Sequence, residues 1–142
     1  MEMKLVQHLS DLCKEMAMVM PLQDAEGAYT VAFYRLFNIR FLISHNSIVL
    51  LTEGLCDAAT QENAWASIEE ALHKSYGWPG LSTSLSVNDG GELVVQTLIN
   101  EGCTYDTFFD LTNAHCNFCE RLLGEIRRVP DTKVNYHAFI TP

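Results

Sequence analysis

The sequence is 142 residues long, 48% hydrophobic and 19% charged, which fits one folded domain and excludes a disordered chain. Its 18 acidic and 9 basic residues leave a net charge of −9, which repels phosphate backbones and anionic membrane surfaces, so we expect neither nucleic acid nor a membrane as a partner. The five cysteines are an odd number scattered through a core-rich chain, which indicates reduced thiols rather than a disulfide scaffold.

Residues 3–20 are predicted to form the first helix, because apolar residues recur there every three or four positions and Pro21 stops the pattern. Charged residues interrupt this segment, which therefore lacks the apolar core of a signal peptide, and no apolar run reaches the roughly 18 residues of a membrane span. We therefore expect a soluble, cytoplasmic protein. The methionine-rich end of the helix has two interpretations, core filling or an adaptable protein-binding surface that includes Met16 and Met20.

Three strands are predicted next, over residues 28–36, 38–44 and 47–53, because these segments alternate apolar residues and are rich in β-branched and aromatic side chains. His45 and Asn46 are a short polar pair that can turn the chain between the second and the third strand. The three strands therefore form an antiparallel meander.

A second helix is predicted over residues 61–75, because its apolar residues gather on one side. That side includes Trp65, Ile68 and Leu72. Gly77 is expected to end this helix, since glycine readily adopts the left-handed conformation of a C-cap.

Residues 81–87 alternate apolar or threonine side chains with serines, which predicts a strand with one buried face. The turn sequence NDGG and the apolar segment at 92–99 complete a second hairpin. Thr104 can cap a last helix, which Pro130 stops.

The predicted order is therefore α-β-β-β-α-β-β-α, which indicates one α+β domain over residues 1–128, with a twisted antiparallel sheet packed by helices. A doubly wound α/β fold is excluded because hairpins rather than helices join most of the strands. Residues 129–142 lack a clear pattern, so we expect a loosely ordered C-terminal tail.

The last helix carries the motif AHCNFCERLL, in which Cys116 and Cys119 raise the alternative of a redox or metal protein. Both cysteines lie in the middle of the helix, away from the free N–H groups that stabilise a thiolate at a helix N-terminus. No second CxxC or pair of histidines completes a zinc site, so we interpret both cysteines as core residues. The sequence also contains no GxSxG, P-loop or GxGxxG motif, and we expect no enzyme, no cofactor and no metal.

The predicted meander has more apolar residues than one face of a sheet needs. Successive side chains of a strand point to opposite faces of the sheet. The set that we expect to face the helices is Val31, Phe33, Ile39, Phe41, Ile43, Ile48 and Leu50. Alternation then places on the other face Ala32, Tyr34, Leu36, Leu42, Val49 and Leu51. Each exposed large apolar side chain forgoes roughly 1.5–3 kcal/mol of burial. We therefore expect a second copy of the chain or an extended peptide to cover this face, unless the tail or a helix of the same chain does so.

The order of elements, together with SIVLLTEGL, ENAWASIEEAL and NDGGELVVQTLI, resembles class I type III secretion chaperones of the Tir-chaperone-like family over residues 3–128. The resemblance implies a bacterial cytoplasmic dimer without catalytic residues or nucleotide. Such a chaperone binds the N-terminal segment of a secreted effector in extended form and keeps it competent for export. A small dimeric α+β regulatory domain without a secretion role is the alternative, besides the CxxC redox or metal protein.

The resemblance also implies which residues contact each partner. The client-binding residues would be Tyr34, Leu36, Leu42, Val49 and Leu51, together with Met16 and Met20 from the first helix. Trp65, Ile68 and Leu72 would form the dimer interface. Both a homodimer and a heterodimer with a related chaperone agree with this pattern.

Overall fold

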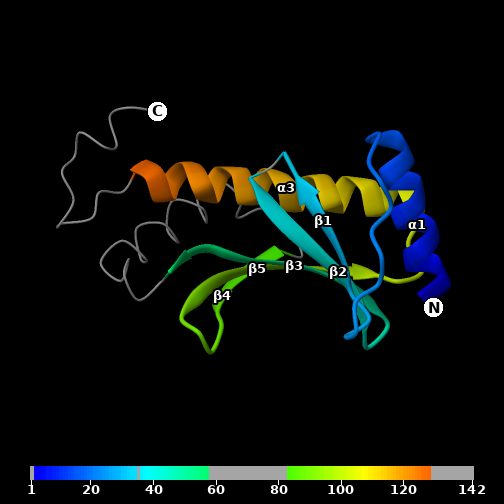
Figure 1. The fold of residues 1–142 in the computed structure, drawn as a ribbon, viewed down its shortest axis with the longest axis horizontal. Helices are drawn as coiled ribbons and strands as arrows, with labels where there is room; N and C mark the ends of the chain where they lie inside the picture. The colour runs from blue at the N-terminus through cyan, green and yellow to red at the C-terminus, as the bar shows by residue number, and fades with distance from the viewer. Residues whose placement is uncertain (1, 35, 58–82, 129–142) are drawn as a thin grey trace.

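The computed structural model describes residues 2–34, 36–57 and 83–128, whose elements are labelled in Figure 1. In chain order the elements are α1 (Glu2–Glu15), β1 (Tyr29–Phe33), β2 (Phe37–Ser44), β3 (Ser47–Asp57), β4 (Thr83–Val87), β5 (Glu92–Asn100) and α3 (Tyr105–Arg128). The predictions that fall outside the described residues are the helix over 61–75, with Trp65, Ile68, Leu72 and Gly77, and the tail at 129–142.

The five strands form one antiparallel sheet in the order β1-β2-β3-β5-β4. α3 runs along one face of this sheet, and α1 stands at one end of the same layer (Figure 1). We call the face that packs against these helices the inner face and the opposite one the outer face. This arrangement confirms the predicted α+β domain, in which helices pack against an antiparallel sheet.

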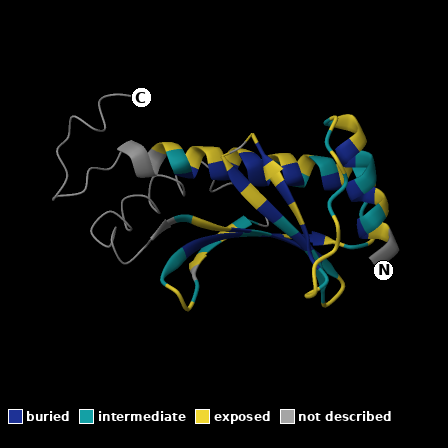
Figure 2. Cartoon of the chain, viewed as in Figure 1, coloured by how far each residue is buried: buried dark blue, intermediate teal, exposed yellow. Residues whose placement is uncertain are grey.

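The hydrophobic core lies between the inner face and the two helices. Buried and exposed residues alternate along β1 and the first half of β2, as the period-two pattern predicts (Figure 2). The core residues of the meander are Val31, Phe33, Ile39, Phe41, Ile48 and Leu50, with Ile43 packed against them, and the helices add Leu5, Leu9, Leu12, Phe108, Phe118 and Leu122. The predicted helix-facing set is thereby confirmed.

α1 ends at Glu15, earlier than the predicted residue 20. The amide of Met18 donates a 2.7 Å hydrogen bond to the carbonyl oxygen of Cys13, and Ala17 has a φ of 55°. This combination is the Schellman motif, which closes a helix through one residue in the left-handed conformation. Glycine is the usual residue at that position and marks a helix end in a sequence. Alanine does not, so the sequence does not reveal that α1 ends here.

Replacing Ala17 by glycine is expected to stabilise the chain by about 1 kcal/mol. The left-handed conformation costs a non-glycine residue roughly 1–2 kcal/mol, and the greater freedom of glycine in the unfolded chain offsets part of the gain. Thermal unfolding should show a higher midpoint for this variant than for the wild type. The control Lys14→Gly, inside the regular part of α1, should lower the midpoint. An Ala17→Gly variant that melts below the wild type would contradict this helix end.

β1 ends at Phe33, and the chain turns before β2 begins at Phe37. Phe33 pairs with Phe37 across the hairpin, and its carbonyl oxygen accepts a 3.0 Å hydrogen bond from the amide of Leu36. Tyr34 has a φ of 55°, which an extended strand does not allow. The prediction that the strand runs to residue 36 is therefore wrong, and Tyr34 and Leu36 belong to the turn rather than to a strand face.

Both other predicted hairpin turns are confirmed. His45 and Asn46 have φ values of 49° and 64°, as the two central residues of a type I′ turn require. In the NDGG turn, the side-chain oxygen of Asn88 accepts a 3.0 Å hydrogen bond from the amide of Glu92, and Gly91 has a φ of 81°. These turns fix the register of the strands on either side.

α3 begins directly after Thr104, as predicted. The hydroxyl oxygen of Thr104 accepts a 3.2 Å hydrogen bond from the amide of Thr107, which satisfies one of the free donors of the first helical turn. Among the described residues, no helix is both long and apolar enough to cross a lipid bilayer.

Candidate functional site

The outer face of the sheet carries apolar side chains across β2, β3 and β5. The register places Leu42 beside Val49, and Val49 beside Leu98, while Leu51 lies on the same face two residues along β3. The core cluster between the inner face and the helices includes none of the four, and Leu98 is 43% exposed. We call Leu42, Val49, Leu51 and Leu98 the apolar row. Both described helices pack on the inner face, so neither of them covers it (Figure 1).

Polar residues flank the apolar row. Arg40 and Gln96 are the strand neighbours of Leu51 on either side. The guanidinium group of Arg40 lies 3.0 Å from a carboxylate oxygen of Glu26 and 3.5 Å from one of Asp24, which ties it to the segment before β1. An apolar centre with a polar rim is the usual composition of a protein-binding surface.

Three of the predicted client-binding residues therefore meet on the outer face. Leu42 and Leu51 are half-buried, whereas Val49 is only 8% exposed, so Leu42, Leu51 and Leu98 offer most of the accessible surface. Leu98 was missed in the sequence, although the alternation in ELVVQTLI contains the signal: its neighbours Thr97 and Ile99 are buried on the inner face. The pairing of β3 with β5 brings it to the row.

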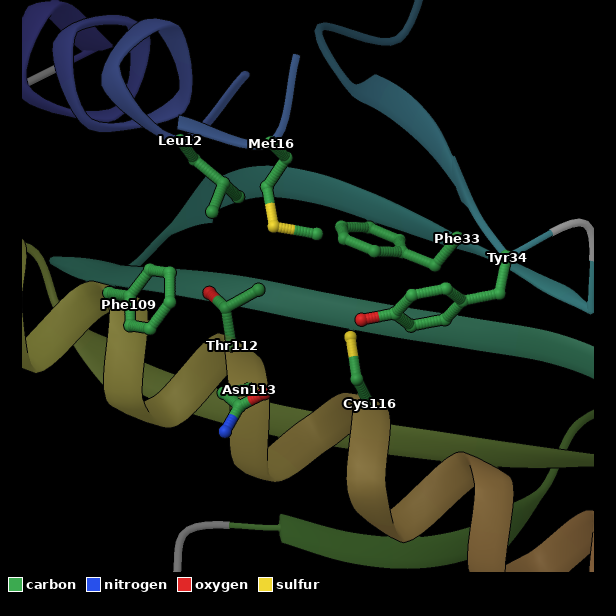
Figure 3. Close-up of a pocket in the computed structure, with 8 residues that line it drawn as sticks. All are labelled: Leu12, Met16, Phe33, Tyr34, Phe109, Thr112, Asn113 and Cys116. Carbon is green, nitrogen blue, oxygen red and sulfur yellow. The ribbon is translucent and has the colours of Figure 1, made fainter. Parts of the chain in front are cut away.

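The other predicted client-binding residues lie elsewhere. Tyr34, which is 59% exposed, and Met16 both line a pocket between α1, β1 and α3 (Figure 3). Leu36 is 48% exposed at the turn before β2. Met20 follows the end of α1 and is half-buried against the core. Of the predicted set, Leu42, Val49 and Leu51 therefore lie in the apolar row, Met16 and Tyr34 line the pocket, and Leu36 and Met20 belong to neither.

A buried polar network joins α3 to the inner face of the sheet. The imidazole of His115 is fully buried, with Nε2 at 2.8 Å from the hydroxyl of Thr52 and Nδ1 at 2.7 Å from the hydroxyl of Thr97. A further 2.7 Å hydrogen bond joins the hydroxyls of Thr97 and Thr83, which extends the network from β5 to β4. Burial lowers the pKa of His115 to about 4, so the ring is neutral at pH 7 and serves the structure.

Cys116 and Cys119 lie in the hydrophobic core, as predicted. Burial raises the pKa of each thiol to about 12, so both are protonated at neutral pH and are weak nucleophiles. Within the described ranges, no group of three or more His, Cys, Asp or Glu side chains is arranged to hold a metal ion.

No protein-family model matches the sequence, and no curated protein matches it either. Solved structures match its fold. The Yersinia pestis type III secretion chaperone SycH, solved with a stable fragment of YscM2, has a TM-score of 0.59 at 10% identity, covering 82% of this chain and 98% of that chain. A chain of the HopA1–SchA chaperone–effector complex has a TM-score of 0.60 at 11% identity, with 84% and 92% covered. The chain has the fold of the type III secretion chaperones.

This secretion-chaperone fold is not confined to secretion. YbjN from E. coli, which is proposed to be a transcription regulator, has a TM-score of 0.60 at 15% identity, covering 83% of this chain and 88% of YbjN. The resemblance seen in the sequence is thus confirmed for the fold. A function must be argued from the surfaces that this chain presents.

Proposed function

We propose that the chain is a class I type III secretion chaperone that binds the N-terminal segment of a secreted effector in extended form and keeps it export-competent. The observation that carries this proposal is the apolar row, which no described helix covers. The fold supports it, since SycH was solved with a YscM2 fragment and SchA with an effector. The proposed activity is binding alone, without a catalytic residue or a cofactor.

Burial of the apolar row stabilises the complex with a client segment. Burial of one large apolar side chain contributes roughly 1.5–3 kcal/mol, so covering Leu42, Leu51 and Leu98 contributes several kcal/mol. Ordering an extended segment offsets part of this gain. The strands β1 and β4 are the two edges of the sheet, where the backbone of an extended segment can add hydrogen bonds.

We propose further that this chaperone acts as a dimer in the bacterial cytoplasm, either with itself or with a related chaperone. The resemblance to the chaperone family implies a contact through Trp65, Ile68 and Leu72, which lie outside the described residues. Light scattering during size-exclusion chromatography measures the mass of the purified chain directly. A mass of two chains is expected, and a single-chain mass at every concentration would contradict the homodimer.

Purification of the tagged chain from its native host, under non-denaturing conditions, tests the proposed function. A secreted protein should co-purify, and its N-terminal segment should resist protease only while the chain is bound. Recovery of the bare chain alone would contradict the proposal. A regulatory domain without a secretion role would instead bring down a partner that is not secreted, and its gene would lie apart from secretion genes.

A further inference from the structure

Glu53 extends the line of the apolar row along β3. Side chains two residues apart on a strand lie on the same face of the sheet, about 6.7 Å from each other. Val49, Leu51 and Glu53 therefore follow one another on the outer face. The intervening Thr52 is fully buried on the inner face, and Glu53 keeps the regular pairing of β3 with β5, opposite Val94. Along β3 the apolar row thus ends at an acidic side chain.

The carboxylate of Glu53 is accessible to a ligand on the outer face. Glu53 is exposed, and among the described residues no cationic side chain lies within ion-pair distance of it. Its neighbours on this face are apolar, with Leu51 before it on β3 and Val94 beside it on β5. A ligand that has both an apolar part and a cationic end can therefore cover the row and pair with this carboxylate.

Arg40 does not offer an acidic ligand the corresponding ion pair. It is the one basic residue within the five described strands, and it lies beside Leu51 on the outer face. Its guanidinium group donates a 3.0 Å hydrogen bond to Glu26 and lies 3.5 Å from a carboxylate oxygen of Asp24. These three side chains together carry one net negative charge. The described part of the outer face therefore attracts cations and repels anions, in line with the net charge of −9.

An extended client segment repeats its side chains at the spacing of β3. Extended chains that pack face to face keep their directions within about 30° of each other. Alternate side chains of such a segment therefore meet Val49, Leu51 and Glu53 in turn. Two of them are buried against the apolar row, and the next one lies at the carboxylate.

We propose that the client segment on the outer face has two apolar side chains at alternate positions and a lysine or arginine at the next alternate position, which pairs with Glu53. The apolar pair covers the apolar row. The aliphatic stem of the basic residue packs beside Val94 while its charged end reaches the carboxylate of Glu53. The inference rests on the proposed function and names the chemistry of the client segment. A second copy of the chain is the competing occupant of this face.

Selection of displayed random peptides on the full-length chain tests this assignment. The wild type is expected to enrich peptides with the apolar pair and a lysine or arginine two residues beyond it. Glu53→Gln keeps the length of the side chain and removes its charge, so it should enrich the apolar pair alone. Glu53→Lys repels a cation and should disfavour lysine and arginine at the third position. Both variants should melt near the wild type, because Glu53 is exposed. Glu120→Lys, at an exposed site of α3, makes the same change in net charge as Glu53→Lys and should select like the wild type.

The best enriched peptide and its twin with glutamine in place of the basic residue then give the size of the effect. At low salt the wild type should bind the basic peptide roughly twofold to fivefold more tightly than the twin. Glu53→Gln should lose most of this preference, whereas Glu120→Lys should keep it. In the wild type the preference should disappear at about 0.5 M salt, because salt screens charges on the surface.

Four results would speak against this assignment. The same third position in the wild type and both Glu53 variants overturns the inference and leaves the proposed function standing. An equal loss of preference in Glu120→Lys attributes it to net charge alone and overturns the inference too. Enriched peptides that match the chain itself assign the outer face to a second copy, with the same consequence. If neither the wild type nor any variant enriches a peptide, the proposed function itself is contradicted.

Discussion

Acidification from pH 7 to pH 4 is expected to weaken the folded state by roughly 3 kcal/mol through His115 alone. Burial lowers the pKa of this imidazole from 6.5 to about 4 in the folded chain. Its two ring nitrogens already bond to the hydroxyls of Thr52 and Thr97, and protonation makes both nitrogens donors and places a charge in a fully buried site. Each unit of pKa difference corresponds to about 1.4 kcal/mol.

The sign follows from where each state takes up the proton. The unfolded chain binds it below about pH 6.5, whereas the folded chain binds it only below about pH 4. Between these values the unfolded state holds more protons, so stability falls as the pH falls through 6.5 and levels off below 4. Above about pH 6.5 the imidazole is neutral in both the folded and the unfolded chain, so His115 no longer lowers the stability of the folded state.

Urea unfolding of the wild type and of His115→Gln at several pH values between 7 and 4 measures this effect. Glutamine keeps a donor and an acceptor but does not titrate in this range. The stability advantage of the wild type over the variant should shrink by about 3 kcal/mol across the range. Parallel pH profiles of the two chains would show that His115 is not the buried neutral group described here.

Replacing Leu98 by glutamate is expected to abolish tight binding of the client. Leu98 is the most accessible member of the apolar row, at 43% exposed, so the free chain should tolerate the change with little loss of stability. In the complex the variant loses roughly 1.5–3 kcal/mol of apolar burial and buries an unpaired carboxylate as well. Calorimetry with the co-purified client should show an affinity at least about tenfold lower.

Leu22→Glu is the matched control for this prediction. Leu22 is 92% exposed and lies in the segment between α1 and β1, outside the apolar row. The same substitution there should leave the affinity unchanged, because no burial against the client is lost. If Leu98→Glu binds as tightly as Leu22→Glu, the apolar row does not contact the client.

The strands were predictable because their signals are local. Period-two alternation, the polar pair at 45–46 and the NDGG turn determine the strands and hairpins within a few residues. The ends of α1 and β1 were misplaced for one common reason. Both depend on a residue with a positive φ, Ala17 and Tyr34, whose types seldom adopt that conformation.

The parts of the site that escaped prediction depend on contacts between distant segments. Leu98 joins the apolar row only because β5 pairs with β3, and alternation within a strand does not reveal its neighbour. The same holds for the buried network, in which His115 meets Thr52 and Thr97 from two different strands. Tyr34 was predicted to lie on the outer face, but the turn after β1 brings it to the pocket on the helix side instead.

The labelling rate of a cysteine at position 98 tests most directly whether a client covers the outer face. In the free Leu98→Cys chain, iodoacetamide should modify this thiol rapidly, while the buried Cys116 and Cys119 stay slow and serve as internal references. In the complex purified with its client, labelling at position 98 should become as slow as at these references. Equally rapid labelling of position 98 in the free chain and in the complex would contradict the account.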